Sequence, residues 1–304
     1  MTSILDRPLK WRTISTLGWR RRIANAVATV LVTLSMGIAL TPLLWVLCSV
    51  FFNGFKAITS SVWWSHAQAG TTAFEPAGGA LHAIVGTVLL GLACAAISIP
   101  IGVMVGIYQA EYGGSGPLAR LVAFTVDILA GVPSIVAALF IYAVWVSTLG
   151  LPRSQFAVSL ALVLLMLPVI ARATEEMLRI VPVDLREASY ALGIPKWKTI
   201  ARVVLPTGMS GILTGILLAF ARVLGETSPL LILVGYSNSM NFDMFSGFMG
   251  SLPGMMYDQI SAGAGANPVP TDRLWGAALT LVLLIALLNI AARLVAKIFS
   301  PKKL

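Results

Sequence analysis

The stretch "LRIVPVDLREASYALGIPKWKTIARVVLP", residues Leu178–Pro206, separates two long apolar runs at 155–177 and 207–235. Each run has the roughly 20 apolar residues that cross about 30 Å of hydrocarbon. The stretch between them is polar and carries the positive charges Arg179, Arg186, Lys196, Lys198 and Arg202. This order predicts two membrane-spanning helices joined by a structured loop outside the bilayer.

Two short helices are expected within this loop. Asp184 is followed three residues later by Glu187, a variant of the capping box, so we expect Asp184 to cap a helix over about 185–192. Gly193 is the residue type that most readily takes the left-handed conformation after a helix. Pro195 suits the first position of the second helix, where its missing N–H costs nothing.

The second helix is expected to end near Val204, before Pro206 opens the next span. On the first helix, Ala188, Ser189 and Ala191 are expected to be exposed. Their small side chains would permit close approach by another protein.

The composition is that of a polytopic membrane protein. The chain has 304 residues, of which 58% are hydrophobic and 11% charged, whereas a soluble domain has roughly 25% charged residues. We predict an all-α fold, since the ten-residue alternation of a membrane barrel is absent from the sequence. Six spans are expected, at about 24–52, 80–109, 119–148, 155–177, 207–235 and 274–298.

The net charge of +9 indicates topology rather than a nucleic-acid partner. Basic residues gather before the first span, in the 178–206 loop and at the end of the chain. The loops of opposite sidedness hold only Lys56, Arg153 and Arg273. By the positive-inside rule, both termini and the 178–206 loop are expected to be cytoplasmic.

Four regions are predicted along the chain: a cytoplasmic basic segment at 1–23, the first transmembrane helix with an external loop at 24–79, the main transmembrane region at 80–298, and a cytoplasmic tail at 299–304. The main region contains a second loop at 236–273, rich in Gly, Ser, Asn, Met and Pro. We expect this loop to be external, with at most short helical turns.

Close helix packing is expected at two places. Gly102 and Gly106 lie four residues apart in the second predicted span, and Gly211 and Gly215 in the fifth. This small-xxx-small spacing lets the backbones of two helices approach closely. Such pairs occur in many membrane bundles and carry no functional signal.

The 178–206 loop resembles the conserved cytoplasmic loop of ABC importer permeases, Glu-Ala-Ala-xxx-Gly followed by Ile-x-Leu-Pro. The matching residues are Glu187, Ala188, Ser189, Gly193, Leu205 and Pro206, with Ser189 in place of Ala and Val203 in place of Ile. In that family the loop docks in a groove of the ATPase subunit. The resemblance implies a type I, MetI-like permease with 178–206 as its coupling loop.

Three further segments are similar to A-type permeases of the high-affinity phosphate (Pst) importer family: 129–139, 171–178 and 221–231. The match covers roughly 80–298. It implies a subunit of a bacterial cytoplasmic membrane importer for inorganic phosphate. It also implies a second, C-type permease, two copies of a cytoplasmic ATPase that uses ATP and Mg²⁺, and an extracytoplasmic phosphate-binding protein.

Two arginines fall within apolar spans, where an arginine costs roughly 2.5–3.5 kcal/mol on insertion scales. Arg222 and Glu226 stand four residues apart and are expected on one face of a continuous fifth span. Arg172 in the fourth span precedes Glu175 by three residues, while Asp127 in the third span is expected to be structural.

These pairs have two interpretations. Each pair could simply neutralise itself and hold the bundle together. Alternatively they line an anion path, since a guanidinium matches phosphate oxygens bidentately and a nearby carboxylate prevents trapping of the anion. The family resemblance associates arginines at the positions of Arg222 and Arg172 with phosphate translocation, so we predict a path lined by Arg222, Arg172, Glu226 and Glu175.

No catalytic motif is present in the sequence. It lacks the phosphate loop of ATPases, the Gly-x-Ser-x-Gly elbow and the His-Glu-x-x-His zinc motif. Cys48 and Cys94 lie in predicted spans and offer neither a disulfide framework nor a metal spacing. We therefore expect a non-catalytic subunit, in contact with membrane lipid, that binds no cofactor or metal.

Two alternative functions stay open. The first is a permease for another oxyanion, such as sulfate, molybdate or phosphonate, against which the segment "RVLGETSPLL" argues. The second is an ATP-independent anion transporter or channel. That class would show a pseudo-repeat of its spans and needs no docking loop, and the sequence shows the loop without the repeat.

Overall fold

The computed structural model describes residues 18–299. Of the predicted basic segment 1–23 and tail 299–304, residues 1–17 and 300–304 lie outside the described part. The chain divides into two compact units, at 1–49 and 50–304. The helix α1 (Trp19–Ile58) begins in the first unit and ends in the second.

The described residues are almost entirely helical, as predicted. After α1 come α2 (Ser61–Ser65), α3 (Leu81–Ile107) with the π-helical η2 (Tyr108–Tyr112), α4 (Pro117–Gly131), α5 (Ser134–Ile141) with η3 (Tyr142–Thr148), α6 (Gln155–Ile180), α7 (Val183–Ala191), α8 (Lys196–Thr199) with η4 (Ile200–Val204), α9 (Leu205–Leu224), α10 (Ser228–Leu233), α11 (Leu252–Ser261) and α12 (Pro268–Phe299). Within residues 18–299, five helices are long and apolar enough to cross a membrane, or six if a bent pair of helices is counted as one span.

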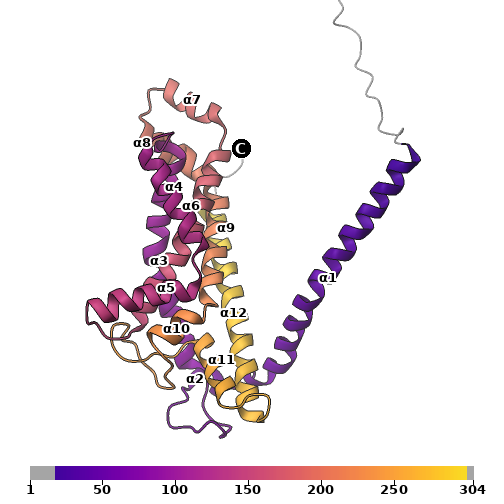
Figure 1. Cartoon of the computed structure of the whole chain (residues 1–304), viewed down its shortest axis with the longest axis vertical. Helices are drawn as coiled ribbons and strands as arrows, with labels where there is room; N and C mark the ends of the chain where they lie inside the picture. Colours follow the sequence, from indigo (N-terminus) through magenta and orange to yellow (C-terminus); the bar gives the residue numbers. More distant parts are fainter. Residues whose placement is uncertain (1–17, 300–304) are drawn as a thin grey trace, which may run out of the picture. The chain divides into compact units, whose positions relative to one another are not determined.

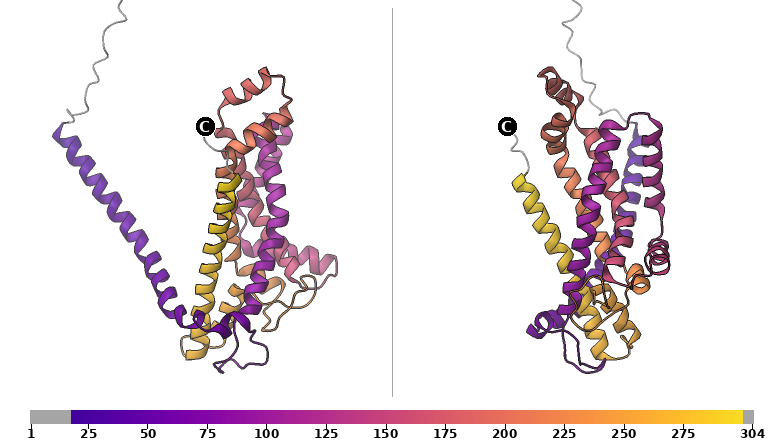
Figure 2. Two further views of the ribbon diagram at one scale, coloured as in Figure 1. Left: turned by 180° about the vertical axis from the view of Figure 1, so that it is seen from behind. Right: turned by 90° about the vertical axis from the view of Figure 1, so that its left-hand side faces the viewer.

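The predicted third span is not one helix. The segment 117–148 bends by 107° between α4 and α5, and α5 lies across the bundle (Figures 1 and 2). Val132 is extended, with ψ of 126°, and Pro133 follows it. Proline lacks the N–H of a helix interior and disfavours helical geometry in the residue before it. The predicted span at 119–148 is therefore a bent pair of helices rather than a single helix.

The predicted fifth span is interrupted in the same way. The helix α9 ends at Leu224, Gly225 is its C-cap, and α10 begins only at Ser228. Pro229 cannot donate the backbone hydrogen bond that a helix through 207–235 would require of it. This break changes the geometry of the predicted Arg222 site, described below.

The helix α6 is the centre of the second unit, with α3, α5 and α9 packed around it. Both predicted small-residue pairs lie in these contacts, Gly102 and Gly106 against α6 from α3, and Gly211 and Gly215 from α9. A Cβ atom added at Gly106 would lie 2.5 Å from Thr174 Cβ, and one at Gly215 would lie 2.3 Å from Ala173 Cβ. Only glycine permits these separations.

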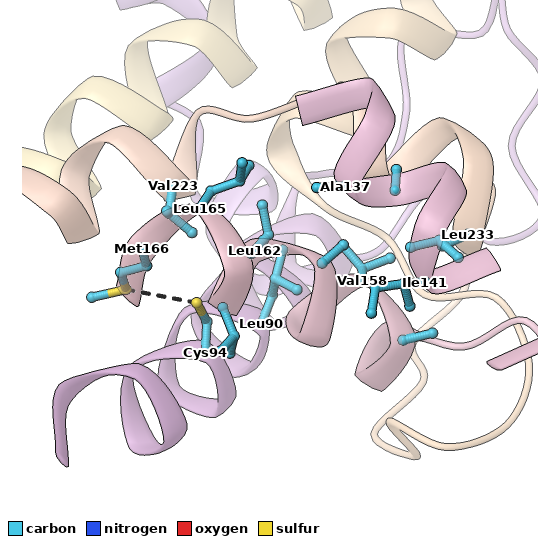
Figure 3. Packing of buried hydrophobic residues seen from close by; sticks show 14 of the residues in the cluster. Leu90, Cys94, Ala137, Ile141, Val158, Leu162, Leu165, Met166, Val223 and Leu233 are labelled. Atoms are coloured by element: carbon cyan, nitrogen blue, oxygen red, sulfur yellow. Dashed lines mark hydrogen bonds between the residues drawn. The ribbon is translucent and has the colours of Figure 1, made fainter. Parts of the chain in front are cut away.

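The largest apolar core joins α3, α5, α6, α9 and α10 (Figure 3). Leu162 and Met166 of α6 are fully buried there, together with Leu90 and Cys94 of α3. The Cys94 Sγ atom lies 3.6 Å from Met166 Sδ. Cys94 is thus a small core residue.

The two ends of this helical unit differ (Figure 1). The helices α7 and α8 lie at one end, whereas α2, α11 and the start of α12 lie at the other. The 236–273 loop was expected to hold at most short turns, but it contains the ten-residue α11. Ser251 caps this helix by accepting a hydrogen bond from the Gly254 N–H, and α11 packs against α12.

Arg273 is buried at this second end rather than lying in a solvated loop. It belongs to α12 and its exposed fraction is 7%. Its guanidinium donates hydrogen bonds to the carbonyl oxygens of Thr72, Ala73, Glu75 and Ala77. One side chain thereby holds the loop between α2 and α3.

Candidate functional site

Arg172 on α6 is fully engaged by its neighbours. Its Nε donates to Asp127 Oδ1 at 3.0 Å, and Nη2 donates to the same oxygen and to the Ala123 carbonyl. Its Nη1 donates to Glu175 Oε2 at 2.7 Å. All three guanidinium nitrogens therefore already donate hydrogen bonds in this conformation, and no pair of them is available to an anion.

Glu175 completes a neutral network of four charged side chains. It is 9% exposed at its side chain and accepts hydrogen bonds from both Arg172 and Arg179, the latter at 2.8 Å. Two cations and two carboxylates thus balance. Asp127, expected to be structural, is the partner that joins α4 to this network. The sequence feature that could have indicated this pairing was the Asp127 carboxylate itself, because an ionised group within a span requires a counter-charge.

Arg222 presents the opposite situation. Its side chain is 61% exposed, and its Nε lies 4.0 Å from Glu226 Oε1, at the outer limit of an ion pair. Among the side chains that the structure describes, none forms a hydrogen bond with Arg222. The expected i,i+4 geometry on one helical face is wrong, because α9 ends at Leu224 and Glu226 lies beyond it.

The two arginines do not form one cluster. Gly215 of α9 lies against Ala173 of α6, and Gly211 against Met177, so the two helices run antiparallel. This register places Arg222 at the level of Met166, six residues along α6 from Arg172. At 1.5 Å per residue the two levels are about 9 Å apart along the axis. Arg222 of α9 thus lies level with the middle of α6.

The helices that follow the two breaks pack against each other. The helix α10, which follows the break after α9, packs against α5, which follows the break after α4. Non-helical backbone at membrane depth is tolerated where it is buried in protein or lines a polar cavity. Both breaks are therefore compatible with a path through the protein beside α6.

The first helix of the 178–206 loop starts earlier than expected. The helix α7 begins at Val183, its N-cap is Pro182, and no side chain caps it. Asp184 therefore lies in the first turn instead of at the cap, so the predicted capping box with Glu187 is wrong. An acidic residue in the first turn still interacts favourably with the helix dipole.

The turn between α7 and α8 has the predicted glycine conformation. Gly193 has a φ of +73°, and its N–H donates to the Tyr190 carbonyl at 2.9 Å. Pro195 is the N-cap of α8, one position before the expected one. The second helix also does not end near Val204, because the chain stays helical from Lys196 through η4 into α9.

The predicted docking residues differ in exposure. Glu187 and Ala188 are exposed on α7 as expected. Ser189 is 5% exposed, because its Oγ lies 2.8 Å from Thr199 Oγ1 and ties α7 to α8. The expectation of an exposed Ser189 is therefore wrong, while Leu205 and Pro206 are half-buried in the first turn of α9.

Comparison with known proteins supplies a family for this fold. Residues 98–304 match the family model described as "Binding-protein-dependent transport system inner membrane component". A phosphate transport system permease protein of Mycobacterium tuberculosis is 52% identical over 293 residues, which cover 96% of this chain and 94% of the relative. Its counterparts in Mycobacterium leprae and Yersinia pestis are 53% and 39% identical, over 94% of this chain in each case.

Two kinds of solved structure share the fold. A bacterial ABC transporter involved in the import of the acidic polysaccharide alginate aligns with a TM-score of 0.64 at 12% identity, covering 93% of this chain and 99% of that chain. The MetNI methionine ABC transporter aligns with a TM-score of 0.56 at 20% identity, covering 72% of this chain and 94% of that chain. At these identities the likeness concerns the fold alone.

Proposed function

This chain belongs to the family of binding-protein-dependent transport system inner membrane components, and on that premise we propose that it is a permease subunit of a phosphate ABC importer. The observation that carries the proposal is the 52% identity, over 96% of the chain, to a phosphate transport system permease. The chain is then a multi-pass protein of the bacterial inner membrane. Its contribution to transport is a path and a docking loop, without chemistry of its own.

The remaining components follow from this assignment. We infer a second, C-type permease beside this one, an extracytoplasmic phosphate-binding protein, and two cytoplasmic ATPase subunits that use ATP and Mg²⁺. The loop 178–206 would dock on one ATPase. The exposed apolar side chains of α7 and its C-cap support this role, with Val183 60% and Leu192 79% exposed. Apolar groups exposed together on a short helix favour contact with another protein.

Arg222 is the residue we assign to phosphate itself. Its guanidinium makes no hydrogen bond to the described side chains and lies level with the middle of α6. The nearest carboxylate oxygen, Glu226 Oε1, is 4.0 Å from its Nε, at the outer limit of an ion pair. A free fork of this kind matches two phosphate oxygens. Glu226 compensates the charge when no anion is bound and weakens retention of the anion.

Arg172 has a more restricted role in this proposal. Asp127 and Glu175 occupy its donors, so it can contact phosphate only in a state in which Asp127 has moved away. In the present conformation Arg172 and Asp127 act as a brace between α6 and α4.

The deciding experiment is phosphate uptake by the double variant Arg222→Gln with Glu226→Gln in a strain lacking other phosphate transporters. Deleting both charges removes the anion contact while leaving no unpaired ion. We expect the variant to reach the membrane and assemble but to lose uptake. The matched control is Lys56→Gln with Asp272→Asn, which deletes an exposed ion pair of 2.7 Å elsewhere and should transport normally.

Wild-type uptake by the Arg222/Glu226 double variant would show that the pair has a purely structural role. Competition with unlabelled sulfate, molybdate and phosphonate tests the other oxyanions. If one of them, and not phosphate, suppressed uptake of the labelled anion, the proposed substrate would be wrong.

A further inference from the structure

A buried ion pair joins the coupling loop to the end of α3. Arg186 of α7 donates to Glu111 Oε1 through Nη2 at 2.7 Å and through Nε at 3.2 Å. The side chains of Arg186 and Glu111 are only 15% and 5% exposed. Removing one partner of such a pair leaves an uncompensated buried charge, which is strongly unfavourable.

The same guanidinium also binds the end of α6. Its Nη1 donates to the Val181 carbonyl at 2.6 Å, and Nη2 donates to the Leu178 carbonyl at 2.8 Å. These carbonyls belong to the C-terminal end of α6, where a cation interacts favourably with the helix dipole. Arg186 therefore connects α7 to two helix ends at once.

The second half of the loop is tied to the same place. Lys196, the first residue of α8, donates to the backbone carbonyl of Glu111. Its Nζ also lies 4.7 Å from the centroid of the Tyr112 ring. Both contacts fall on η2, the π-helical turn at the end of α3. Short π-helical segments of this kind are frequent at functional sites.

From η2 the connection continues through tightly packed backbone. Gly106 of α3 lies against Thr174 and the Ala171 carbonyl, on either side of Arg172 in the sequence of α6. The close approach of α3 and α6 leaves no space for them to slide independently. A displacement of the coupling loop at Glu111 would thus move both helices together.

We propose that Glu111 and Arg186 are positioning residues that transmit movement of the coupling loop to α3 and α6. This inference rests on the proposed function of the 178–206 loop as the ATPase-docking element. Neither residue is one of the predicted path residues Arg222, Arg172, Glu226 and Glu175. Their role is to make the loop and the two helix ends one mechanical unit.

Hydrogen exchange of the detergent-solubilised complex tests the transmission without any substrate. Adding a non-hydrolysable ATP analogue to the native complex should change amide exchange in both 178–206 and 108–112. In Glu111→Gln and in Arg186→Gln the change should stay within 178–206. The control is Glu176→Gln, an exposed carboxylate on α6, which should behave like the native chain.

A double-mutant cycle on ATP hydrolysis provides the second measurement. Each single variant should retain its ATPase subunits and its basal hydrolysis. The stimulation of hydrolysis by loaded binding protein should fall by about fivefold or more. The variant with both changes should be no worse than the more impaired single one, because the two residues act through each other.

Several results would overturn the proposal. One is a native complex in which amide exchange at 108–112 does not change when the nucleotide analogue is added. Another is a Glu111→Gln complex in which exchange at 108–112 still changes. Additive losses in the cycle would show that the residues act separately, and loss of the ATPase subunits would show a role in assembly. Absence of phosphate uptake by the native complex would instead refute the proposed substrate, leaving the exchange experiment valid.

Discussion

Asp127 of α4 and Arg172 of α6 are joined through two nitrogen donors of the guanidinium and one carboxylate oxygen. The contact crosses 45 residues of sequence and links the helix that ends at the bend to the central helix of the bundle. Glu175 holds the same guanidinium from the other side. The pair therefore explains how an arginine is accommodated within the fourth span.

The two carboxylates of this network should differ in their contribution to stability. Glu175→Gln should cost about 3–5 kcal/mol in free energy of unfolding, because its side chain is 9% exposed and serves two arginines. Asp127→Asn should cost about 1–3 kcal/mol, since Asp127 is 62% exposed. Thermal unfolding in detergent measures both, and a larger loss for Asp127→Asn would contradict the network described here.

Replacing Gly193 by Val should uncouple the loop from the ATPase. Nothing lies within 4 Å of an added Cβ atom, so the cost comes from the φ of +73° alone, about 1–3 kcal/mol for a residue other than glycine. We expect membrane insertion to persist and binding-protein-stimulated ATP hydrolysis to fall. Gly150→Val is the control, with a φ of +66° and equally open space at another site. Equal loss of stimulated hydrolysis in both variants would refute a local role for the Gly193 turn.

Gly106→Ala should destabilise the packing of α3 on α6. The new methyl group would lie 2.5 Å from Thr174 Cβ and 2.7 Å from the Ala171 carbonyl oxygen, and backbone cannot move aside as a flexible side chain can. Overpacking of this kind costs about 1–3 kcal/mol, which lowers the unfolding temperature. Gly131→Ala, with no atom within 4 Å, should leave that temperature unchanged or slightly raised. An unaltered Gly106→Ala protein would show that the helices separate easily.

Arg273→Met should release the loop between α2 and α3. The change keeps an unbranched apolar stem but deletes the side-chain donors to four backbone carbonyls of the loop. We expect faster hydrogen exchange and proteolysis within 70–79. Arg153→Met, which removes an exposed arginine, should leave this loop protected. Unchanged exchange in Arg273→Met would mean that other contacts hold the loop.

Much of this protein followed from local sequence. Apolar runs of sufficient length predict spanning helices, because each helix satisfies its own backbone hydrogen bonds within the segment. The turn at Gly193 was also predictable, because a left-handed conformation after a helix depends only on the residue itself and its immediate neighbours. The glycine pairs on α3 and α9 likewise marked where helices approach closely.

Only the tertiary structure decided which charged groups meet. Arg172 pairs with Asp127 across 45 residues and Arg186 with Glu111 across 75, and no spacing in the sequence specifies such partners. Apolar composition likewise did not reveal where a span breaks, because the segments on both sides of Pro133 and Gly225 remain hydrophobic. Ion pairing and burial depend on the relative placement of whole helices. For that reason Arg172 is held by two carboxylates, while Arg222, in a comparable sequence context, lies 4.0 Å from Glu226 and forms no hydrogen bond with the described side chains.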